Sequence, residues 1–259
     1  MLWQDPADLV AEAFGTPGMR ETFAIIQRLA AHAKAVLICG ETGTGKELAA
    51  LAFHHESRRR ARPFITINCS SAMSTPFERE LFGYERGAFD GAAVPRIGLL
   101  ETADRGTLFF DEIADLPLPA QARLLRVFDD EIHRLGSLES RSVDVAIVAA
   151  TSRDLQREAG EGRFRADLYY RLTGAELTLP PLRQRREDIP HLAACFMRDC
   201  GARIGRTFDG LTPAAERLLH DAPWHGNVRE LRLTIERACL LATGPVLSER
   251  DLGDPLHLH

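Results

Sequence analysis

The sequence lacks the features that mark secreted, membrane-spanning and zinc-binding proteins. Its five cysteines are an odd number and include no Cys-x-x-Cys pair, which argues against a disulfide framework and a zinc site. No apolar run approaches the length of a membrane span, and no basic segment followed by an apolar stretch opens the chain. We therefore expect a cytoplasmic protein that has no membrane contact and whose thiols are reduced and mostly buried.

An excess of positive charge is also missing. The chain carries 32 Lys and Arg against 37 Asp and Glu, a net charge of −5 at pH 7. A surface built to grip nucleic acid throughout is therefore not expected. The densest basic run, Arg58-Arg59-Arg60 with Arg62, has no aromatic platform beside it, so a solvated loop is favoured over a nucleic-acid contact. DNA binding is not expected from this chain alone.

Short uncharged segments rich in β-branched and aromatic residues recur through the first two thirds of the chain. They cover residues 35–38, 64–67, 107–110 and 145–148, with a fifth candidate at 176–179. Continuous rather than alternating apolarity is typical of strands buried on both faces. Because helical patterns such as 121–128 lie between them, the sequence predicts an α/β fold, a five-stranded parallel sheet flanked by helices.

The pattern changes after Pro180-Pro181. Helical segments are predicted over 189–200, from Thr212-Pro213 onward, and from Asn227 to before Gly244; proline after threonine suits a helix start. We predict an N-terminal extension over 1–14, an α/β domain over 15–182, a small α-helical domain over 183–247 and a C-terminal tail over 248–259.

A glycine-rich segment directly follows the first predicted strand and precedes a helical stretch. Such a loop curls backbone N–H groups around phosphates, the helix N-terminus adds positive potential, and a lysine supplies a mobile charge. A glycine-rich turn without a ligand is the alternative, but the lysine in register favours phosphate. The residues expected to hold the nucleotide here are Gly40, Glu41, Thr42, Gly43, Thr44, Gly45, Lys46 and Glu47. Glu47 stands where the general motif has the Ser or Thr that binds Mg²⁺.

Two acidic residues end the third predicted strand. Asp111 is the expected Mg²⁺ ligand, and Glu112 is placed to polarise an attacking water as general base. A pair of acids that only cap the next helix is the alternative. After a phosphate-binding loop, hydrolysis of ATP with Mg²⁺ is the better interpretation.

Several motifs, taken in order, give the chain a specific resemblance. They are the stretches 40–47, 80–92, 106–113, 164–172, 179–183 and 224–231. Over about residues 15–243 the chain resembles the central AAA+ ATPase domain of sigma-54-dependent transcriptional activators, the bacterial enhancer-binding proteins. That family's own phosphate loop also has glutamate after the lysine. The resemblance implies an AAA+ P-loop NTPase fold in which the helical segment is a lid domain.

The resemblance also implies roles for single residues around the nucleotide. Lys46 would bind phosphate, Asp111 would bind magnesium and Glu112 would activate water. Asn68 resembles the polar residue that holds this glutamate away until nucleotide and partner are engaged.

Three arginines carry the remaining implied roles. Arg165 and Arg171 resemble arginine fingers that reach into a neighbouring subunit's site, and Arg229 resembles the second sensor, which couples nucleotide state to the lid. Because residues six apart on a helix point about 120° apart, the two fingers are expected to have unequal roles. Surface arginines that are solvated or paired with a nearby acid are the alternative for all three.

The first sensor of the family usually reads Ala-Thr-Asn, whereas here Thr151 is followed by Ser152. Thr151 is kept as a nucleotide-binding candidate. Because serine is shorter than asparagine and has a single polar atom, we expect some loss of coupling between γ-phosphate and lid.

The segment that should touch the protein partner is Gly87, Ala88, Phe89, Asp90, Gly91 and Ala92. Small residues around one aromatic suit a mobile loop with an apolar tip; a tight turn with Phe89 buried in its own core is the alternative. The family ordinarily has threonine where Asp90 stands. An ionised aspartate only accepts hydrogen bonds and carries a full charge, so engagement of sigma-54 is in question.

The resemblance implies a ring-forming, hexameric ATPase that remodels the sigma-54 RNA polymerase holoenzyme and so activates transcription. One alternative is an AAA+ regulator or adaptor that binds or hydrolyses ATP without engaging sigma-54, as Asp90 and Ser152 would allow. A weaker alternative treats the last two helices as a DNA-binding helix-turn-helix.

Overall fold

The computed structural model describes residues 6–71 and 76–253. Contacts divide the chain into two compact units, described separately here. The sheet unit comprises residues 23–40 and 46–178, and the helical unit comprises residues up to 22, 41–45 and those from 179 onward. Residues 1–5 and 254–259 of the two expected terminal segments lie outside the described residues.

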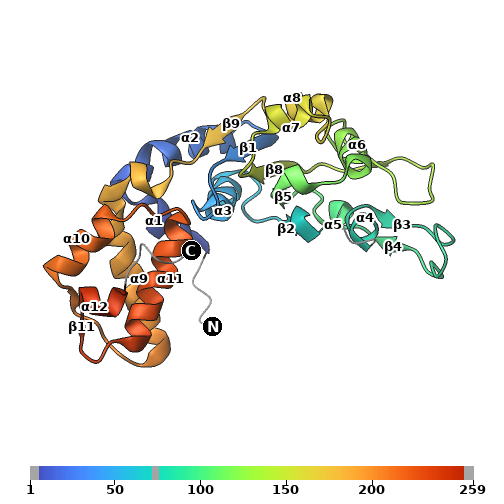
Figure 1. Cartoon of the computed structure of the whole chain (residues 1–259). Coiled ribbons are helices and arrows are strands. Elements are labelled where there is room, and N and C mark those ends of the chain that lie inside the picture. The colour runs from blue at the N-terminus through green and yellow to red at the C-terminus, as the bar shows by residue number, and fades with distance from the viewer. Residues whose placement is uncertain (1–5, 72–75, 254–259) are drawn as a thin grey trace. The chain divides into compact units, whose positions relative to one another are not determined.

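The sheet unit is built on five parallel strands in the order β2-β5-β8-β1-β9 (Figure 1). Their bounds are β1 (Ala35–Cys39), β2 (Phe64–Asn68), β5 (Thr107–Asp111), β8 (Ala146–Thr151) and β9 (Glu176–Thr178). All six residues of β8 are buried, as expected for a central strand covered on both faces. The predicted five-stranded parallel sheet is confirmed, with the fourth strand extended to Thr151.

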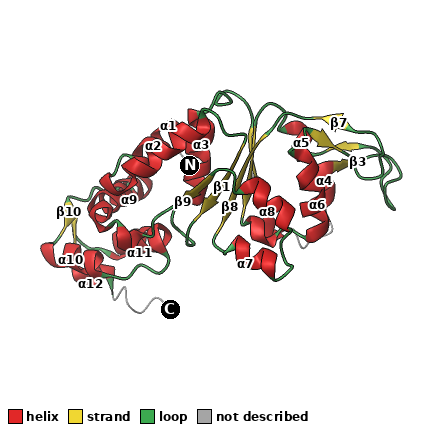
Figure 2. Ribbon diagram, turned by 90° about the horizontal axis from the view of Figure 1, so that it is seen from above, coloured by secondary structure: helices red, strands yellow, loops and turns green. Residues whose placement is uncertain are grey.

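Helices cover both faces of this sheet. Figure 2 shows α3 on one side of the strands and α7 and α8 on the other. The helix bounds are α2 (Arg20–Ala30), α3 (Lys46–Glu56), α4 (Pro76–Phe82), α5 (Leu99–Thr102), α6 (Leu118–Val127), α7 (Leu155–Gly160) and α8 (Ala166–Leu172). Leu108, Phe110, Leu124 and Leu168 are fully buried in one continuous apolar core. This core fixes the strand ends on which the site is built.

Two antiparallel hairpins extend from the sheet unit. The first joins β3 (Gly83–Tyr84) to β4 (Arg96–Ile97), and the second joins β6 (Glu131–Ile132) to β7 (Arg141–Ser142). They lie side by side, because the Glu85 N–H donates to the Leu135 carbonyl at 3.0 Å and the Leu135 N–H donates to the Gly83 carbonyl at 3.0 Å.

The helical unit has its own core. Its helices are α1 (Pro6–Phe14), α9 (Ile189–Ile204), α10 (Pro213–Asp221), α11 (Asn227–Leu241) and α12 (Glu249–Leu252), with a small parallel pair β10 (Gly210–Leu211) and β11 (Val246–Leu247). Short 3₁₀ turns complete the two units: η1 (Pro17–Met19), η2 (Cys69–Ser71), η3 (Ile113–Asp115), η4 (Leu182–Gln184) and η5 (Arg186–Asp188). Thr212 caps α10 by accepting from the Ala215 N–H, as the Thr-Pro start predicts.

The thiols agree with the sequence-based expectation. All five cysteines are free, and four of them are buried. Burial, reinforced by the neighbouring Glu176, raises the pKa of the half-buried Cys39 to about 12, so that this thiol stays protonated at neutral pH. Within the described residues, no helix combines the length and apolarity that crossing a bilayer requires.

Candidate functional site

The predicted site residues of the sheet unit meet at one edge of the sheet. Because the strands are parallel, their carboxyl ends share that edge, where open α/β sheets bind ligands. Asn68 at the end of β2 is in register with Asp111 at the end of β5, and Cys39 of β1 is in register with Thr151 of β8. The phosphate loop leaves β1 beside β8, where the Gly40 N–H donates to the Thr151 carbonyl at 3.2 Å.

Lys46 is the first residue of α3 and is only 7% exposed. Its Nζ donates to the Gly40 carbonyl at 3.0 Å and lies 3.2 Å from Oε1 of Glu112. A buried ammonium is stable only where it is paired, and both partners lie at the mouth of the loop. The ammonium of this lysine is thus held between a loop carbonyl and a carboxylate.

Glu112 follows β5 in a left-handed backbone conformation, φ 50° and ψ 56°. Its Oε2 accepts from both the backbone N–H and the Oγ of Ser152, at 3.0 Å each. Burial alone would raise the pKa of Glu112, but the Ser152 N–H and the Lys46 charge outweigh it and hold that pKa below its usual value. The carboxylate is therefore ionised at neutral pH, the form that a general base requires.

Three further candidates, Thr151, Asn68 and Asp111, lie near Glu112 at the strand ends, each with different hydrogen-bond partners or exposure. Thr151 is fully buried, and its Oγ1 accepts from the Arg153 N–H at 3.0 Å. Asn68 Oδ1 accepts from the Ser70 N–H at 2.9 Å, and Ser70 in turn donates to Asp115 at 2.8 Å. Asp111 ends β5 next to Glu112 in the chain, partly exposed. One strand-end carboxylate together with phosphate oxygens and water is a donor set that suits Mg²⁺.

Residues 41–45 of the phosphate loop belong to the helical unit. Gly43 and Gly45 have φ of 80° and 104°, which glycine adopts without strain. A Cβ on Gly43 would lie 2.2 Å from the Gly226 carbonyl oxygen, so no larger residue fits this close approach. Glu41, predicted as a nucleotide contact, forms a bidentate pair with Arg183, with N–O distances of 2.6 and 2.7 Å.

Arg229 lies in the first turn of α11. Its backbone N–H donates to the Gly43 carbonyl at 3.3 Å, while its side chain is exposed. It forms none of the ion pairs found among the described residues. Its role as second sensor stays a prediction that this exposure suits.

The two finger candidates are both exposed arginines at α8. Arg165 caps the helix and pairs with Asp167 at 2.8 Å, the alternative that the sequence left open, and Arg171 pairs with Asp129 at 3.0 Å. Gln121, fully buried, accepts from the Arg165 N–H at 2.8 Å and donates to the Leu116 carbonyl at 2.6 Å. This glutamine links the segment after Glu112 to the start of the finger helix.

The partner-loop candidate, Gly87–Ala92, forms a closed turn. The Gly87 N–H donates to the Ala92 carbonyl at 2.9 Å, and both glycines have positive φ, 81° and 94°. Phe89 is half-buried: its ring meets Tyr84 edge-on, with centroids 4.9 Å apart, and the Arg79 guanidinium lies 3.5 Å from its centroid. Asp90 is exposed. The aromatic tip is therefore held by two side chains of its own chain.

An ion-pair network joins the two hairpins beneath this loop. Arg134, 8% exposed, donates to Glu101 at 2.6 and 2.8 Å and to Glu85 at 3.0 Å, and Arg141 donates to Glu85 at 3.3 Å. The paired carboxylates of Glu101 and Glu85 raise the pKa of Arg134. A shift of one hairpin would therefore move the other.

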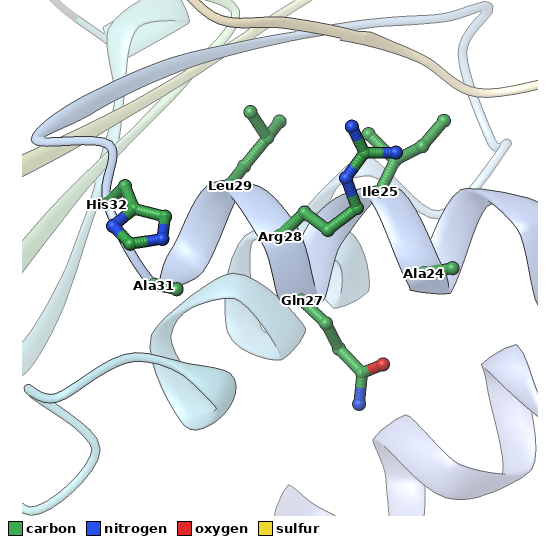
Figure 3. Close-up of a pocket in the computed structure, with 7 residues that line it drawn as sticks. All are labelled: Ala24, Ile25, Gln27, Arg28, Leu29, Ala31 and His32. Carbon is green, nitrogen blue, oxygen red and sulfur yellow. The ribbon is translucent and has the colours of Figure 1, made fainter.

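A shallow hollow along α2 holds none of these candidates (Figure 3). Ile25 and Leu29 lie on one side of the helix, and Gln27 points the other way, donating to Glu56 at 3.0 Å. The hollow is lined by Ala24, Ile25, Gln27, Arg28, Leu29, Ala31 and His32. It is an open helix face rather than the site.

Three contacts of the candidate site were not predicted from the sequence. The contact of Ser152 with Glu112, the bridge made by Gln121 and the anchoring of Glu41 by Arg183 each join residues more than 35 positions apart. Only Ser152 gave a usable signal, because it stands at the expected first-sensor position a few residues after the predicted strand 145–148.

Two family models match most of the chain. The family described as "Sigma-54 interaction domain" matches residues 13–178, and the "AAA+ ATPase lid domain" matches residues 183–258. Transcriptional regulatory protein ZraR of Klebsiella oxytoca is 46% identical over 250 residues, 96% of this chain and 56% of that protein. The DNA-binding transcriptional regulator NtrC of Klebsiella pneumoniae is 45% identical over 251 residues, 96% of this chain and 53% of that protein.

A solved structure agrees with these matches. NtrX from Brucella abortus in complex with ATP aligns with a TM-score of 0.83 and 34% identity, over 91% of this chain and 52% of that chain. The chain spans about half the length of the curated relatives it matches.

Proposed function

This chain belongs to the family of sigma-54-dependent transcriptional activators, with its sigma-54 interaction domain and its AAA+ lid, and from that premise we propose that it is a ring-forming ATPase. In this proposal, hydrolysis of ATP drives a loop movement that remodels the sigma-54 RNA polymerase holoenzyme and opens promoter DNA. The family match favours this function over an adaptor that does not engage sigma-54.

The observation that carries the proposal is the arrangement of Glu112. It is ionised, fixed by Ser152 and paired with Lys46 at the carboxyl edge of the sheet. When ATP binds, its phosphate would replace Glu112 as the ion-pair partner of Lys46. The released Glu112 carboxylate would then polarise water for attack on the γ-phosphate. Bound Mg²⁺ would neutralise phosphate charge and be held by Asp111. Asn68 and Thr151 would order the polar groups around the Glu112 carboxylate.

Assembly into a ring, which we take to be hexameric, would complete the site. Arg165 and Arg171 are exposed, and within the described part of the chain each pairs with an exposed acid; such pairs contribute little and exchange readily. We infer that a neighbouring subunit's nucleotide recruits these arginines, with unequal roles. An arginine finger raises the rate of P-loop enzymes by about 10³–10⁵, so activity would depend on subunit contact.

The loop Gly87–Ala92 would deliver the movement to sigma-54. Release of Phe89 from Arg79 and Tyr84 would expose the apolar tip, and the Glu85–Arg134–Glu101 network would transmit the shift between hairpins. Asp90 adds a charge at the tip, which we infer weakens rather than prevents engagement.

ATPase rate per subunit against protein concentration tests this function. The wild type is expected to rise steeply with concentration, Lys46→Ala to be inactive throughout, and Arg171→Ala to assemble and bind nucleotide but lose at least about 10³-fold in rate. A wild type whose rate per subunit is independent of concentration down to a proven monomer contradicts the ring.

A further inference from the structure

Four consecutive residues of the phosphate loop, 41–44, are hydrogen-bonded to two later segments of the helical unit, 182–185 and 226–229. Glu41 pairs with Arg183, and the Thr42 carbonyl accepts from Asn227 Nδ2 at 3.0 Å. The Gly43 carbonyl accepts from the Val228 N–H at 3.0 Å, and the Thr44 carbonyl accepts from Arg185 at 2.9 Å. The loop backbone therefore takes its shape from the segments 182–185 and 226–229 as well as from its own glycines.

Asn227 is the centre of this arrangement. It is fully buried with φ of 54°, its Oδ1 accepts from the Leu182 N–H at 2.8 Å, and its Nδ2 donates to Glu41 Oε2 at 3.1 Å and to the Thr42 carbonyl. One side chain thus joins both helical-unit segments to the loop. Because a buried amide that loses its partners is costly, this bridge is fixed.

Arg183 neutralises the charge that Glu41 brings into the phosphate loop. The hydrogen bonds from Arg183 and Asn227 lower the pKa of Glu41 to about 2, so the carboxylate is charged at neutral pH. A negative charge in a loop that receives phosphate opposes binding unless it is neutralised. The bidentate guanidinium neutralises it and fixes its direction, which a lysine does only as a point charge.

We propose that Arg183 is a positioning residue for nucleotide binding: through its bidentate pair with Glu41, which Asn227 also contacts, it clamps residues 41–44 of the phosphate loop to the segments 182–185 and 226–229 in the shape that accepts a nucleoside di- or triphosphate. The clamp makes the nucleotide affinity of the loop depend on Arg183 and Asn227. This inference rests on the proposed function, because it concerns the same nucleotide.

Glu41→Gln separates the clamp from a purely electrostatic effect. If Glu41 only repels phosphate, removing its charge tightens nucleotide binding; if it anchors the loop, the same change weakens binding. We expect the Kd for a fluorescent ADP analogue to rise about two- to fivefold, the range for a partly exposed ion pair. Arg183→Gln is expected to do the same, and Glu41→Gln/Arg183→Gln no more than either alone, because the two residues act as one pair.

Arg183→Lys asks whether geometry or charge matters. It keeps the charge and loses the fork, so the clamp predicts weakened binding, whereas simple neutralisation predicts wild-type affinity. At saturating ATP the kcat of Arg183→Lys is expected to stay within about twofold of wild type, since only loop positioning is altered. Arg203→Gln, which breaks the 2.7 Å pair with Glu236 in the same unit, is the matched control and should leave the Kd unchanged.

Melting temperatures separate positioning from unfolding, because a merely structural role would lower them together with affinity. Binding by Glu41→Gln at wild-type strength or tighter overturns the clamp, as does wild-type binding by Arg183→Lys or a drop in Arg203→Gln equal to that of Arg183→Gln. In each of these cases a wild type that binds, and a Lys46→Ala variant that does not, leave the proposed function standing. A wild type that binds no nucleotide overturns both.

Discussion

Ser152 is joined to Glu112 by two hydrogen bonds, because its backbone N–H and its Oγ both donate to Oε2 of the carboxylate at 3.0 Å. Asparagine is usual at this position in sigma-54 activators, and we expected the shorter serine to couple less well to the nucleotide. In the structure serine reaches the proposed general base directly, and the expected loss of coupling to the nucleotide stays a prediction. Its contact orients Glu112 and holds it ionised.

Ser152→Ala removes one of these two bonds. The pKa of Glu112, held below its usual value, is expected to rise, and the acid limb of the kcat profile to move to higher pH. The sign follows from the depressed pKa: the active, ionised form persists above it and is lost as the pH falls through it. A neutral-pH loss of about tenfold or less corresponds to one hydrogen bond of about 0.5–1.5 kcal/mol.

The measurement is kcat against pH for wild type, Ser152→Ala and Ser152→Thr. Threonine keeps the hydroxyl and should retain the wild-type acid limb. An unshifted limb in Ser152→Ala would show that the hydroxyl does not tune Glu112.

Arg79→Ala is expected to loosen the partner loop, because the guanidinium 3.5 Å from the Phe89 centroid helps to hold the tip. A cation–π contact at a partly exposed site is worth about 0.5–1 kcal/mol, so amide exchange over residues 83–98 should quicken about two- to fivefold. Hydrogen exchange by mass spectrometry measures this. Arg86 is an exposed arginine directly before this loop, and Arg86→Ala should leave exchange unaltered; equal effects of the two variants would refute the contact.

Asp90→Thr is expected to strengthen coupling to sigma-54. Asp90 is exposed, and in a ring each pair of such charges a few ångströms apart costs about 1 kcal/mol in water. Open-complex formation per ATP hydrolysed, in a reconstituted transcription assay, should rise. Added salt should narrow the gap between the two proteins by screening. An unchanged yield per ATP would show that Asp90 does not limit engagement.

Gln121→Leu is expected to destabilise the sheet unit and misplace the finger helix. The buried amide donates to the Leu116 carbonyl and accepts from the Arg165 N–H. Leucine leaves both groups unpaired, and each unpaired group lowers the free energy of unfolding by about 1–3 kcal/mol. Urea denaturation should show a lowered midpoint with little change in slope. Gln121→Glu keeps an acceptor for the Arg165 N–H but sets a buried carboxylate oxygen against the Leu116 carbonyl, so it should be destabilised as well; equal stability of wild type and Gln121→Leu contradicts the bridge.

Much of the fold was predictable from local patterns. Uncharged apolar runs such as 107–110 and 145–148 identified strands buried on both faces, and Thr212-Pro213 identified the start of α10, because each feature depends on neighbours in the chain. The same holds for the phosphate loop, in which Lys46 stands in register between a strand and a helix. Each of these features depends on residues that follow one another in the chain.

What the tertiary structure alone decided are contacts between distant residues. The sequence by itself determined the sheet, the helical segment and the order of the motifs, since spacing and periodicity set local conformation. It did not determine that Glu41 turns to Arg183, that Ser152 meets Glu112 or that Phe89 rests on Arg79. Those pairings depend on which chain segments folding brings within hydrogen-bond or van der Waals reach, and no local pattern encodes that distance.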